Sequence, residues 1–181
     1  MSQKIVFMGT PEFSVPTLES LVKSNHKILA VYSQPASKAK RGQKIIPSQV
    51  EVSAKEHSLN LRTPDSLDND KEYNYLKKLE PDIVIVIAYG KIIPKKFLDL
   101  SKHGFINVHA SLLPKWRGAA PIQRSIMNLD RQTGISIMKI SEKLDTGPVC
   151  NSYTLDILEN ENVESLSERL SLLAAEKILY D

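Results

Sequence analysis

The segment from Ile83 to Ala88 constrains the fold of this chain more than any other. It reads Ile-Val-Ile-Val-Ile-Ala, so it is apolar at every position rather than at alternate positions. A strand with one solvent-exposed face alternates apolar and polar residues, whereas a strand buried on both faces is apolar throughout. Such strands are typical of parallel sheets covered by helices on both sides. The segment therefore predicts an α/β protein with a mostly parallel, twisted sheet.

The first part of the chain supports the same fold class. Lys4–Met8 is a short apolar run that ends at Gly9, and Ile28–Tyr32 is a second one. Between them, apolar residues recur at helical spacing from Val15 to Val22. A strand, a helix and a strand in this order indicate two parallel strands joined by a helical crossover.

The rest of the chain continues with the same kinds of element. Composition and periodicity predict further strands at 59–62, 105–109, 133–140 and 149–155, the last of them antiparallel to its neighbour, and helices at 47–57, 73–79, 94–100, 121–127 and 163–180. Residues 33–46 are polar, lack periodicity and contain Pro35 and Gly42, so we expect a long exposed loop there.

The predicted strand 105–109 carries two polar side chains at its end. Asn107 and His109 are two residues apart, so they point to the same face. Pro114 follows closely, and the chain continues into a loop rich in Pro and Gly. In open α/β sheets, ligands bind at this edge. The amide can donate to an oxygen that becomes negative, and the imidazole can exchange a proton near neutral pH.

A third polar group occurs later, in the turn Leu144-Asp145-Thr146-Gly147-Pro148. An aspartate in such a turn also caps the turn itself, and the sequence alone does not show that Asp145 meets His109. A carboxylate beside an imidazole would orient it. Taken alone, His109 is better explained as a satisfied, half-buried histidine than as a catalytic group. The three residues together favour a catalytic site.

Several other classes of function are excluded or disfavoured. The glycine patterns of dinucleotide-binding and Walker loops are absent, and the single cysteine, Cys150, allows neither an internal disulfide nor a cysteine-based zinc site. We expect Cys150 to be a small buried apolar residue and Trp116 to pack within its loop, with Arg117 bonding nearby carbonyls. The longest apolar run, Ile83–Tyr89, is too short to span a membrane. With a first strand starting near Lys4, no signal peptide is expected, and we predict a cytoplasmic protein.

Positive charge is concentrated in one segment. The net charge is only +3, but residues 1–50 carry seven Lys or Arg against two Glu, most densely from Lys38 to Lys44. Such a segment could contact a phosphate backbone. From charge alone, a solvated surface turn is the more common explanation.

Three motifs resemble those of the formyltransferases that use 10-formyltetrahydrofolate. They are Asn107-Val-His109, the run from Ser111 to Gln123 (Ser-Leu-Leu-Pro-Lys-Trp-Arg-Gly-Ala-Ala-Pro-Ile-Gln), and Leu144-Asp145-Thr-Gly-Pro. The opening Phe7-Met-Gly-Thr-Pro and the strand end Ala88-Tyr89-Gly90 fit as well. The resemblance covers essentially the whole chain, and is strongest to the members that act on initiator methionyl-tRNA.

This resemblance implies a Rossmann-like, formyltransferase-type sheet and assigns roles to individual residues. It implies a catalytic trio of Asn107, His109 and Asp145. It implies a folate pocket lined by Ser111, Leu112, Leu113, Pro114, Tyr89, Gly90 and Leu144, and tRNA contacts from Lys38, Lys40, Arg41 and Lys44. In the family the basic loop reads closer to Pro-Asp-Arg-Pro-x-Gly-Arg-Gly, and of that motif this chain keeps Arg41-Gly42.

The resemblance also bears on organisation and partners. Residues 1–181 are expected to be a catalytic domain, truncated near its end and without the C-terminal β-barrel that helps family members bind tRNA. A monomer with a formylfolate co-substrate, no metal and no membrane contact is expected. Two alternatives remain: the same chemistry on another amine, such as a sugar-nucleotide or glycinamide ribonucleotide, and a nucleotide-binding module without catalysis.

Overall fold

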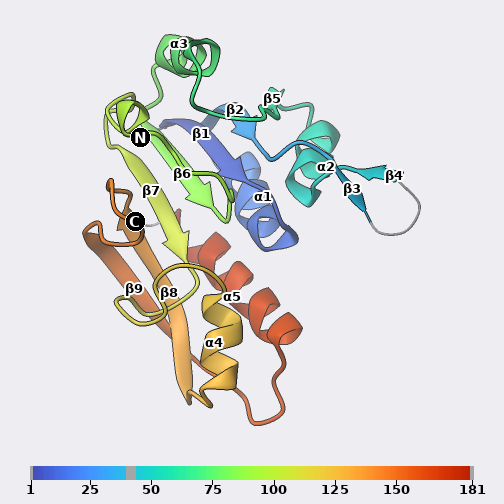
Figure 1. Cartoon of the computed structure of the whole chain (residues 1–181), viewed down its shortest axis with the longest axis vertical. Coiled ribbons are helices and arrows are strands. Elements are labelled where there is room, and N and C mark those ends of the chain that lie inside the picture. Colours follow the sequence, from blue (N-terminus) through green and yellow to red (C-terminus); the bar gives the residue numbers. More distant parts are fainter. Residues whose placement is uncertain (1, 40–43, 180–181) are drawn as a thin grey trace.

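A computed structural model describes residues 2–39 and 44–179. Its main sheet has seven strands in the order β5-β2-β1-β6-β7-β8-β9 (Figure 1). The strands are β1 (Lys4–Gly9), β2 (Lys27–Tyr32), β5 (Leu61–Arg62), β6 (Ile83–Ile87), β7 (Phe105–His109), β8 (Gln132–Lys139) and β9 (Val149–Asp156). The first five strands in this order, β5 to β7, are parallel to one another. Strand β8 is antiparallel to both β7 and β9. The predicted mostly parallel sheet is confirmed.

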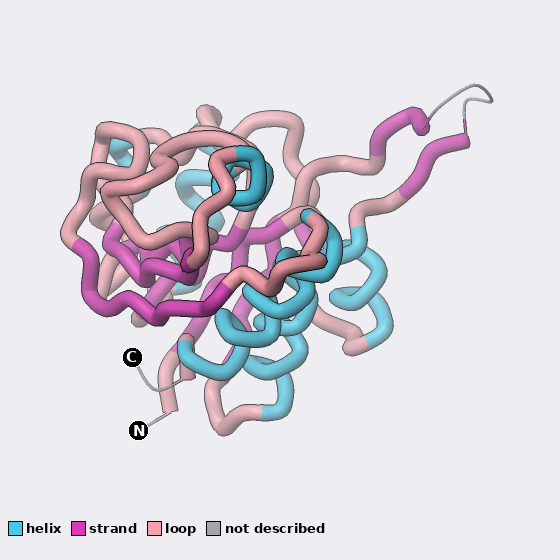
Figure 2. Tube along the Cα trace, turned by 90° about the horizontal axis from the view of Figure 1, so that it is seen from below, coloured by secondary structure: helices cyan, strands magenta, loops and turns pink. Residues whose placement is uncertain are grey.

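Helices cover both faces of this sheet. One face carries α1 (Val15–Lys23), which follows the short turn η1 (Glu12–Ser14), together with α2 (Gln49–Glu56), α4 (Pro121–Met127) and α5 (Val163–Lys177). The other face carries α3 (Asp70–Leu79) and the 3₁₀ turn η2 (Lys95–Phe97). The predicted helix at 94–100 is thus only this single turn. In Figure 2 a group of helices is gathered on one side of the strands.

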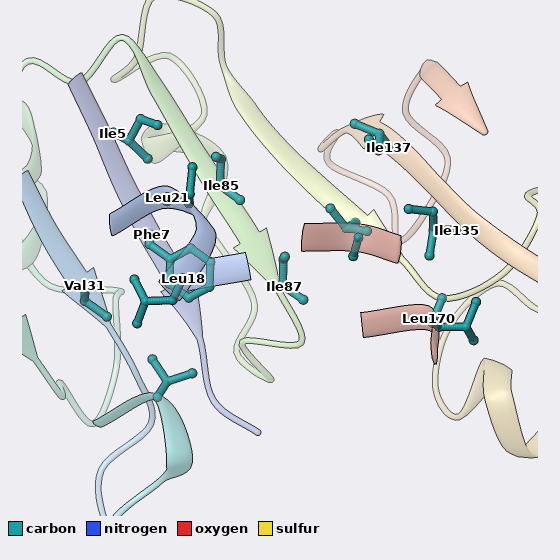
Figure 3. Close-up of a cluster of buried hydrophobic side chains, with 14 of the residues drawn as sticks. Ile5, Phe7, Leu18, Leu21, Val31, Ile85, Ile87, Ile135, Ile137 and Leu170 are labelled. Atoms are coloured by element: carbon teal, nitrogen blue, oxygen red, sulfur yellow. The ribbon is translucent and has the colours of Figure 1, made fainter. Parts of the chain in front are cut away.

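The side chains of β6 explain why its sequence is apolar throughout. Ile85 and Ile87 belong to the core under α1 and α5, whereas Val84 and Val86 belong to the core under α3. Figure 3 shows the first of these cores, where Leu18 of α1 lies against the strands. Both faces of β6 are therefore buried, as the sequence predicts.

Residues 33–46 differ from the sequence prediction. Instead of a loop without secondary structure, they contain a two-stranded antiparallel ribbon of β3 (Ser37–Ala39) and β4 (Lys44–Ile46). The ribbon extends away from the sheet beside α2 (Figures 1 and 2). Ile45 and Ile46 are exposed, so no core dictates an apolar pattern here, and backbone pairing alone defines the strands. Residues 40–43 lie outside the described part of the chain.

The outer strand β9 corrects a second expectation. Cys150 is exposed rather than buried. It lies at the start of β9, whose first four residues are all exposed because the strand forms an edge of the sheet. No helix in the described residues is both long and apolar enough to cross a bilayer.

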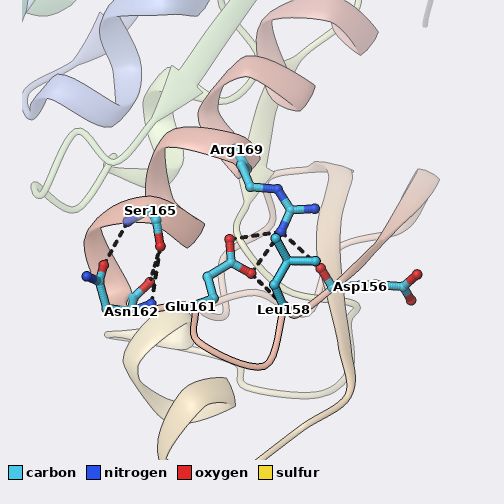
Figure 4. Close-up of polar contacts among 6 residues, drawn as sticks. All are labelled: Asp156, Leu158, Glu161, Asn162, Ser165 and Arg169. Atoms are coloured by element: carbon cyan, nitrogen blue, oxygen red, sulfur yellow. Dashed lines mark hydrogen bonds and ion pairs between the residues drawn. The ribbon is translucent and has the colours of Figure 1, made fainter.

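The chain returns from β9 to α5 through a loop fixed by polar contacts (Figure 4). Arg169 Nη1 donates to both carboxylate oxygens of Glu161 at 2.8 Å and to the Asp156 carbonyl at 3.1 Å. Asn162 and Ser165 cap the first turn of α5 reciprocally. These contacts seat α5 on the sheet face that also carries α1.

A buried ion pair connects β5 to α3. Arg62 donates from Nε to Glu72 Oε2 at 2.8 Å and from Nη2 to Oε1 at 2.5 Å, and its guanidinium lies 3.9 Å from the Tyr75 ring centroid. Hydrogen bonding from Arg62 lowers the pKa of Glu72, although burial opposes this shift. The carboxylate therefore stabilises the folded chain in its ionised form.

We expect Glu72→Gln to lower the free energy of unfolding by about 2–3 kcal/mol at pH 7, because it leaves the Arg62 charge without its partner. The pKa of Glu72 is lower in the folded chain than the value of about 4.3 expected when unfolded. The stabilisation is thus complete above that value and is lost as the pH falls through the folded pKa. Urea unfolding at several pH values should show the two proteins converging in acid. Glu142→Gln, which removes only the exposed pair with Lys95, serves as control and should leave the free energy of unfolding essentially unchanged. An equal loss in both variants would contradict the prediction.

Candidate active site

The candidate site lies where β6 and β7 end side by side. Val86 of β6 pairs with Asn107 of β7 in parallel register. Asn107 and His109 alternate with Val108, which belongs to the core under α1 and α5, so both polar side chains point to the opposite face. The Asn107 side chain is half-buried and has no hydrogen-bond partner among the described residues. His109 is 7% exposed. The arrangement predicted from their spacing is confirmed.

The loop after β7 folds back over the strand end. The Ser136 hydroxyl donates to the Ser111 carbonyl at 2.8 Å and accepts from the Leu113 N–H at 3.0 Å. The Ser111 hydroxyl donates to the Lys115 carbonyl at 2.5 Å, which closes a tight turn. As a result, the Trp116 carbonyl lies 2.9 Å from His109 Nε2.

Asp145 reaches the same place from the loop between β8 and β9. Its Oδ2 accepts from the Gly118 N–H at 2.8 Å and lies 3.7 Å from His109 Nδ1. The loop sits close against β8: a Cβ on Gly147 would lie 1.8 Å from the Lys139 carbonyl oxygen, so only glycine fits. The structure therefore brings His109 and Asp145 together although 35 residues separate them along the chain.

The residues expected around a folate ligand differ in how far their side chains are exposed. Leu144 is 74% exposed, and Gly90 is exposed with a left-handed backbone (φ 77°). The Tyr89 side chain is buried in the core under α3, and its carbonyl accepts from Thr10 Oγ1 and Gln34 Nε2. Ser111 is fully buried and its hydroxyl is already bonded. Leu112 and Leu113 are half-buried, and Pro114 is exposed.

The residues expected to contact tRNA are placed only in part. Lys38 lies in β3, where its backbone pairs with Ile45, and Lys44 lies in β4, where its backbone pairs with Ala39. Lys40 and Arg41 lie outside the described residues.

Sequence reasoning missed two residues that shape the site. One is Ser136, which joins β8 to the loop after β7 as described above. The other is Asp130, whose Oδ2 accepts from the Trp116 indole N–H at 2.8 Å and whose Oδ1 lies 2.8 Å from Lys115 Nζ. The Trp116 indole thus bonds to a residue beyond its own loop. Arg117, which was expected to bond nearby carbonyls, is exposed and bonds no carbonyl among the described residues. A single aspartate after a helix gives no signal in the sequence that would reveal such a contact.

The groups gathered here are of the kinds that acyl transfer uses. The site offers an amide donor, an imidazole and a carboxylate at the carboxyl end of parallel strands. Among residues 2–39 and 44–179, no cluster of three or more His, Cys, Asp or Glu side chains could hold a metal ion.

Comparison with known sequences gives a family and several relatives. A family model described as formyl transferase matches residues 3–180. A methionyl-tRNA formyltransferase of Pelagibacter ubique is 61% identical over 180 residues, which are 99% of this chain and 58% of that protein. A protein of the same name from Coxiella burnetii is 49% identical over 179 residues and is covered to 57%. The chain thus spans a little under three fifths of these curated relatives.

Solved structures share the fold. A glycinamide ribonucleotide transformylase from Geobacillus kaustophilus superposes with a TM-score of 0.79 at 19% identity, covering 99% of this chain and 95% of that one. A formyltetrahydrofolate deformylase from Pseudomonas syringae superposes with a TM-score of 0.77 at 16% identity, covering 99% and 60% of the two chains. At these identities the likeness shows the architecture alone.

Proposed function

Because the chain belongs to the formyl transferase family, we propose that it catalyses transfer of a formyl group from 10-formyltetrahydrofolate to the free α-amine of initiator methionyl-tRNA. The observation that carries the proposal is the approach of Asp145 to His109 on the strand face that also presents Asn107. The names of the relatives at 61% and 49% identity support the choice of acceptor.

The reaction is one nucleophilic substitution at the formyl carbon. A free α-amine has a pKa of about 7.7–8.0, so a substantial fraction is neutral near neutral pH and can attack. As the new bond forms, the formyl oxygen becomes negative, and the Asn107 amide and a protonated His109 donate to it. Asp145 takes the proton lost by the amine, directly or through water. The bond from the carbon to N10 then breaks, and N10 takes up a proton.

The folate is proposed to lie over the ends of β6 and β7. Ala88 and Gly90 are exposed there, and Leu144, which precedes Asp145, offers an exposed apolar side chain. The stretch Ser111–Pro114 then acts mainly through its backbone and through Leu113 and Pro114, because the Ser111 hydroxyl is bonded within the loop.

The acceptor end of the tRNA is proposed to meet the β3–β4 ribbon. Lys38, Lys40, Arg41 and Lys44 give this segment a dense positive charge, which suits a phosphate backbone. The ribbon projects from the body of the molecule, where a large partner can reach it (Figure 1). We also propose that residues 1–181 form a catalytic domain that acts as a cytoplasmic monomer in translation initiation.

An acceptor assay tests the proposal. We expect the purified protein to formylate methionyl-tRNA with a kcat/KM at least about 100-fold above that for glycinamide ribonucleotide or an amino-sugar nucleotide, since the wrong acceptor leaves polar groups of the site unpaired. Methionyl-tRNA with a blocked α-amine is the control and should accept no formyl group.

Formylation of a small amine but not of methionyl-tRNA would assign the same chemistry to another acceptor. Binding of a nucleotide without any formyl transfer would instead support a non-catalytic module. Either result would overturn the proposal.

A further inference from the structure

The two ring nitrogens of His109 face different acceptors. Nε2 lies 2.9 Å from the Trp116 carbonyl oxygen, and Nδ1 lies 3.7 Å from Asp145 Oδ2. A carbonyl oxygen has no hydrogen to donate, so Nε2 must carry the hydrogen of this bond. In the neutral ring, Nδ1 is then the nitrogen with the free lone pair. It is also the nitrogen on the side of the candidate catalytic carboxylate.

The Trp116 carbonyl holds this position because its residue is anchored through the side chain. Trp116 has a left-handed backbone (φ 58°), which a bulky residue rarely adopts without support. Its indole N–H donates to Asp130 Oδ2 at 2.8 Å. The Lys115 ammonium lies 5.3 Å from the indole centroid and 2.8 Å from Asp130 Oδ1. The side chains of Lys115 and Trp116 thus both bind the Asp130 carboxylate, which holds the turn that contains them.

That carboxylate is itself fixed. Its side chain is only 6% exposed, Asn128 donates to its Oδ1 at 2.6 Å, and the Asp130 N–H donates to the Ser125 carbonyl of α4 at 3.0 Å. Burial tends to raise the pKa of Asp130, but the hydrogen bonds from Lys115, Asn128 and Trp116 outweigh it and lower the pKa. Asp130 therefore remains an acceptor throughout the neutral range.

We propose that Asp130 is a positioning residue for His109. By holding the Trp116 indole, it keeps the Trp116 carbonyl against Nε2, and this contact fixes the tautomer that leaves Nδ1 to exchange protons at the reacting site. The consequence for catalysis rests on the proposed formyl transfer, whereas the effect on the tautomer does not.

Nitrogen NMR of labelled histidine tests the tautomer directly in the protein without substrate. The chain has four histidines, so the spectrum is simple, and His109→Gln identifies the signals of interest. We expect the wild type to show the form with hydrogen on Nε2. In Trp116→Phe, which removes the indole N–H together with part of the ring, and in Asp130→Ala, the population of the other tautomer should increase about fivefold, which corresponds to the free energy of one hydrogen bond.

Kinetics supply the second readout. Trp116→Phe and Asp130→Ala should lower kcat about 10- to 100-fold while KM for the formyl donor changes less than about threefold, because orientation is lost rather than binding. Gln132→Ala is the matched control: it removes an exposed bond to Asp156 just after the same turn and should change neither readout. If Asp130→Ala does not fold, Trp116→Phe alone still tests the positioning role.

The two proposals can fail separately. A tautomer that shifts in both variants of a protein without formyl transfer activity would support the positioning role and refute the function. A wild type with hydrogen on Nδ1, or an unchanged tautomer in a folded Trp116→Phe protein, would overturn the positioning role even if the enzyme transfers formyl groups.

Discussion

Asn107→Ala is expected to lower kcat by a factor of about 100 to 1,000, the usual loss when one donor to a developing oxyanion is removed. The half-buried Asn107 amide has no hydrogen-bond partner among the described residues, so it is available to the formyl oxygen. KM for both substrates should change little, because the bond strengthens only as charge develops. Steady-state kinetics with each substrate in turn measure both quantities.

Asn107→Asp is the matched variant for this prediction. It keeps the shape of the side chain but replaces the N–H donor by an acceptor, so kcat should fall at least as far as in the alanine variant. Urea unfolding should show both proteins folded, since the Asn107 side chain makes no hydrogen bond to any described residue that would support the strand. If kcat stays within about tenfold of wild type in both, Asn107 is not an oxyanion donor.

Asp145→Asn is expected to lower kcat about 100- to 10,000-fold, because the site loses the group proposed to accept the proton of the amine. The fold should survive. Asparagine tolerates the left-handed backbone of this position (φ 48°), and its carbonyl oxygen can still accept from the Gly118 N–H. Rapid-quench measurement of a single turnover separates this chemical step from product release.

Binding provides the control for Asp145→Asn. Affinity for an unreactive folate analogue should stay within about threefold of wild type, since the substitution keeps the loop in place. Retention of more than about a tenth of the wild-type single-turnover rate would show that another group or bulk water accepts the proton.

The sequence predicts the elements that carry the core well. β7 begins and ends at the predicted residues, because the apolar run between Gly104 and the polar loop leaves no other register. β6 is predicted because its burial on both faces removes every polar position. The β3–β4 ribbon was not predicted, since a strand pair without a core beneath it has no apolar alternation. The expectation that Cys150 is buried is wrong for a related reason. Nothing in the residues around it in the sequence shows that β9 is the last strand of the sheet.

The site is predictable only in part. The spacing of Asn107 and His109 fixes their common face, but the meeting of His109 with Asp145 depends on the antiparallel return of β8 along β7, which local patterns do not determine. The anchoring of Trp116 by Asp130 is less predictable still. It requires left-handed backbone at Trp116, Ala120 and Leu129, none of which is a glycine that would signal such a turn.

The strand order has a consequence for synthesis of the chain. β1 leaves the ribosome well before β6, yet it occupies the middle of the sheet, where Ile5 pairs with Ile83. When β2 has joined one side of β1, the other side remains an unpaired edge until β6 emerges much later. The loop that must close is long, and such distant pairings slow folding. The nascent chain therefore passes through a stage with an open, apolar edge that invites pairing with other chains, and during that stage chaperones have a target to shield.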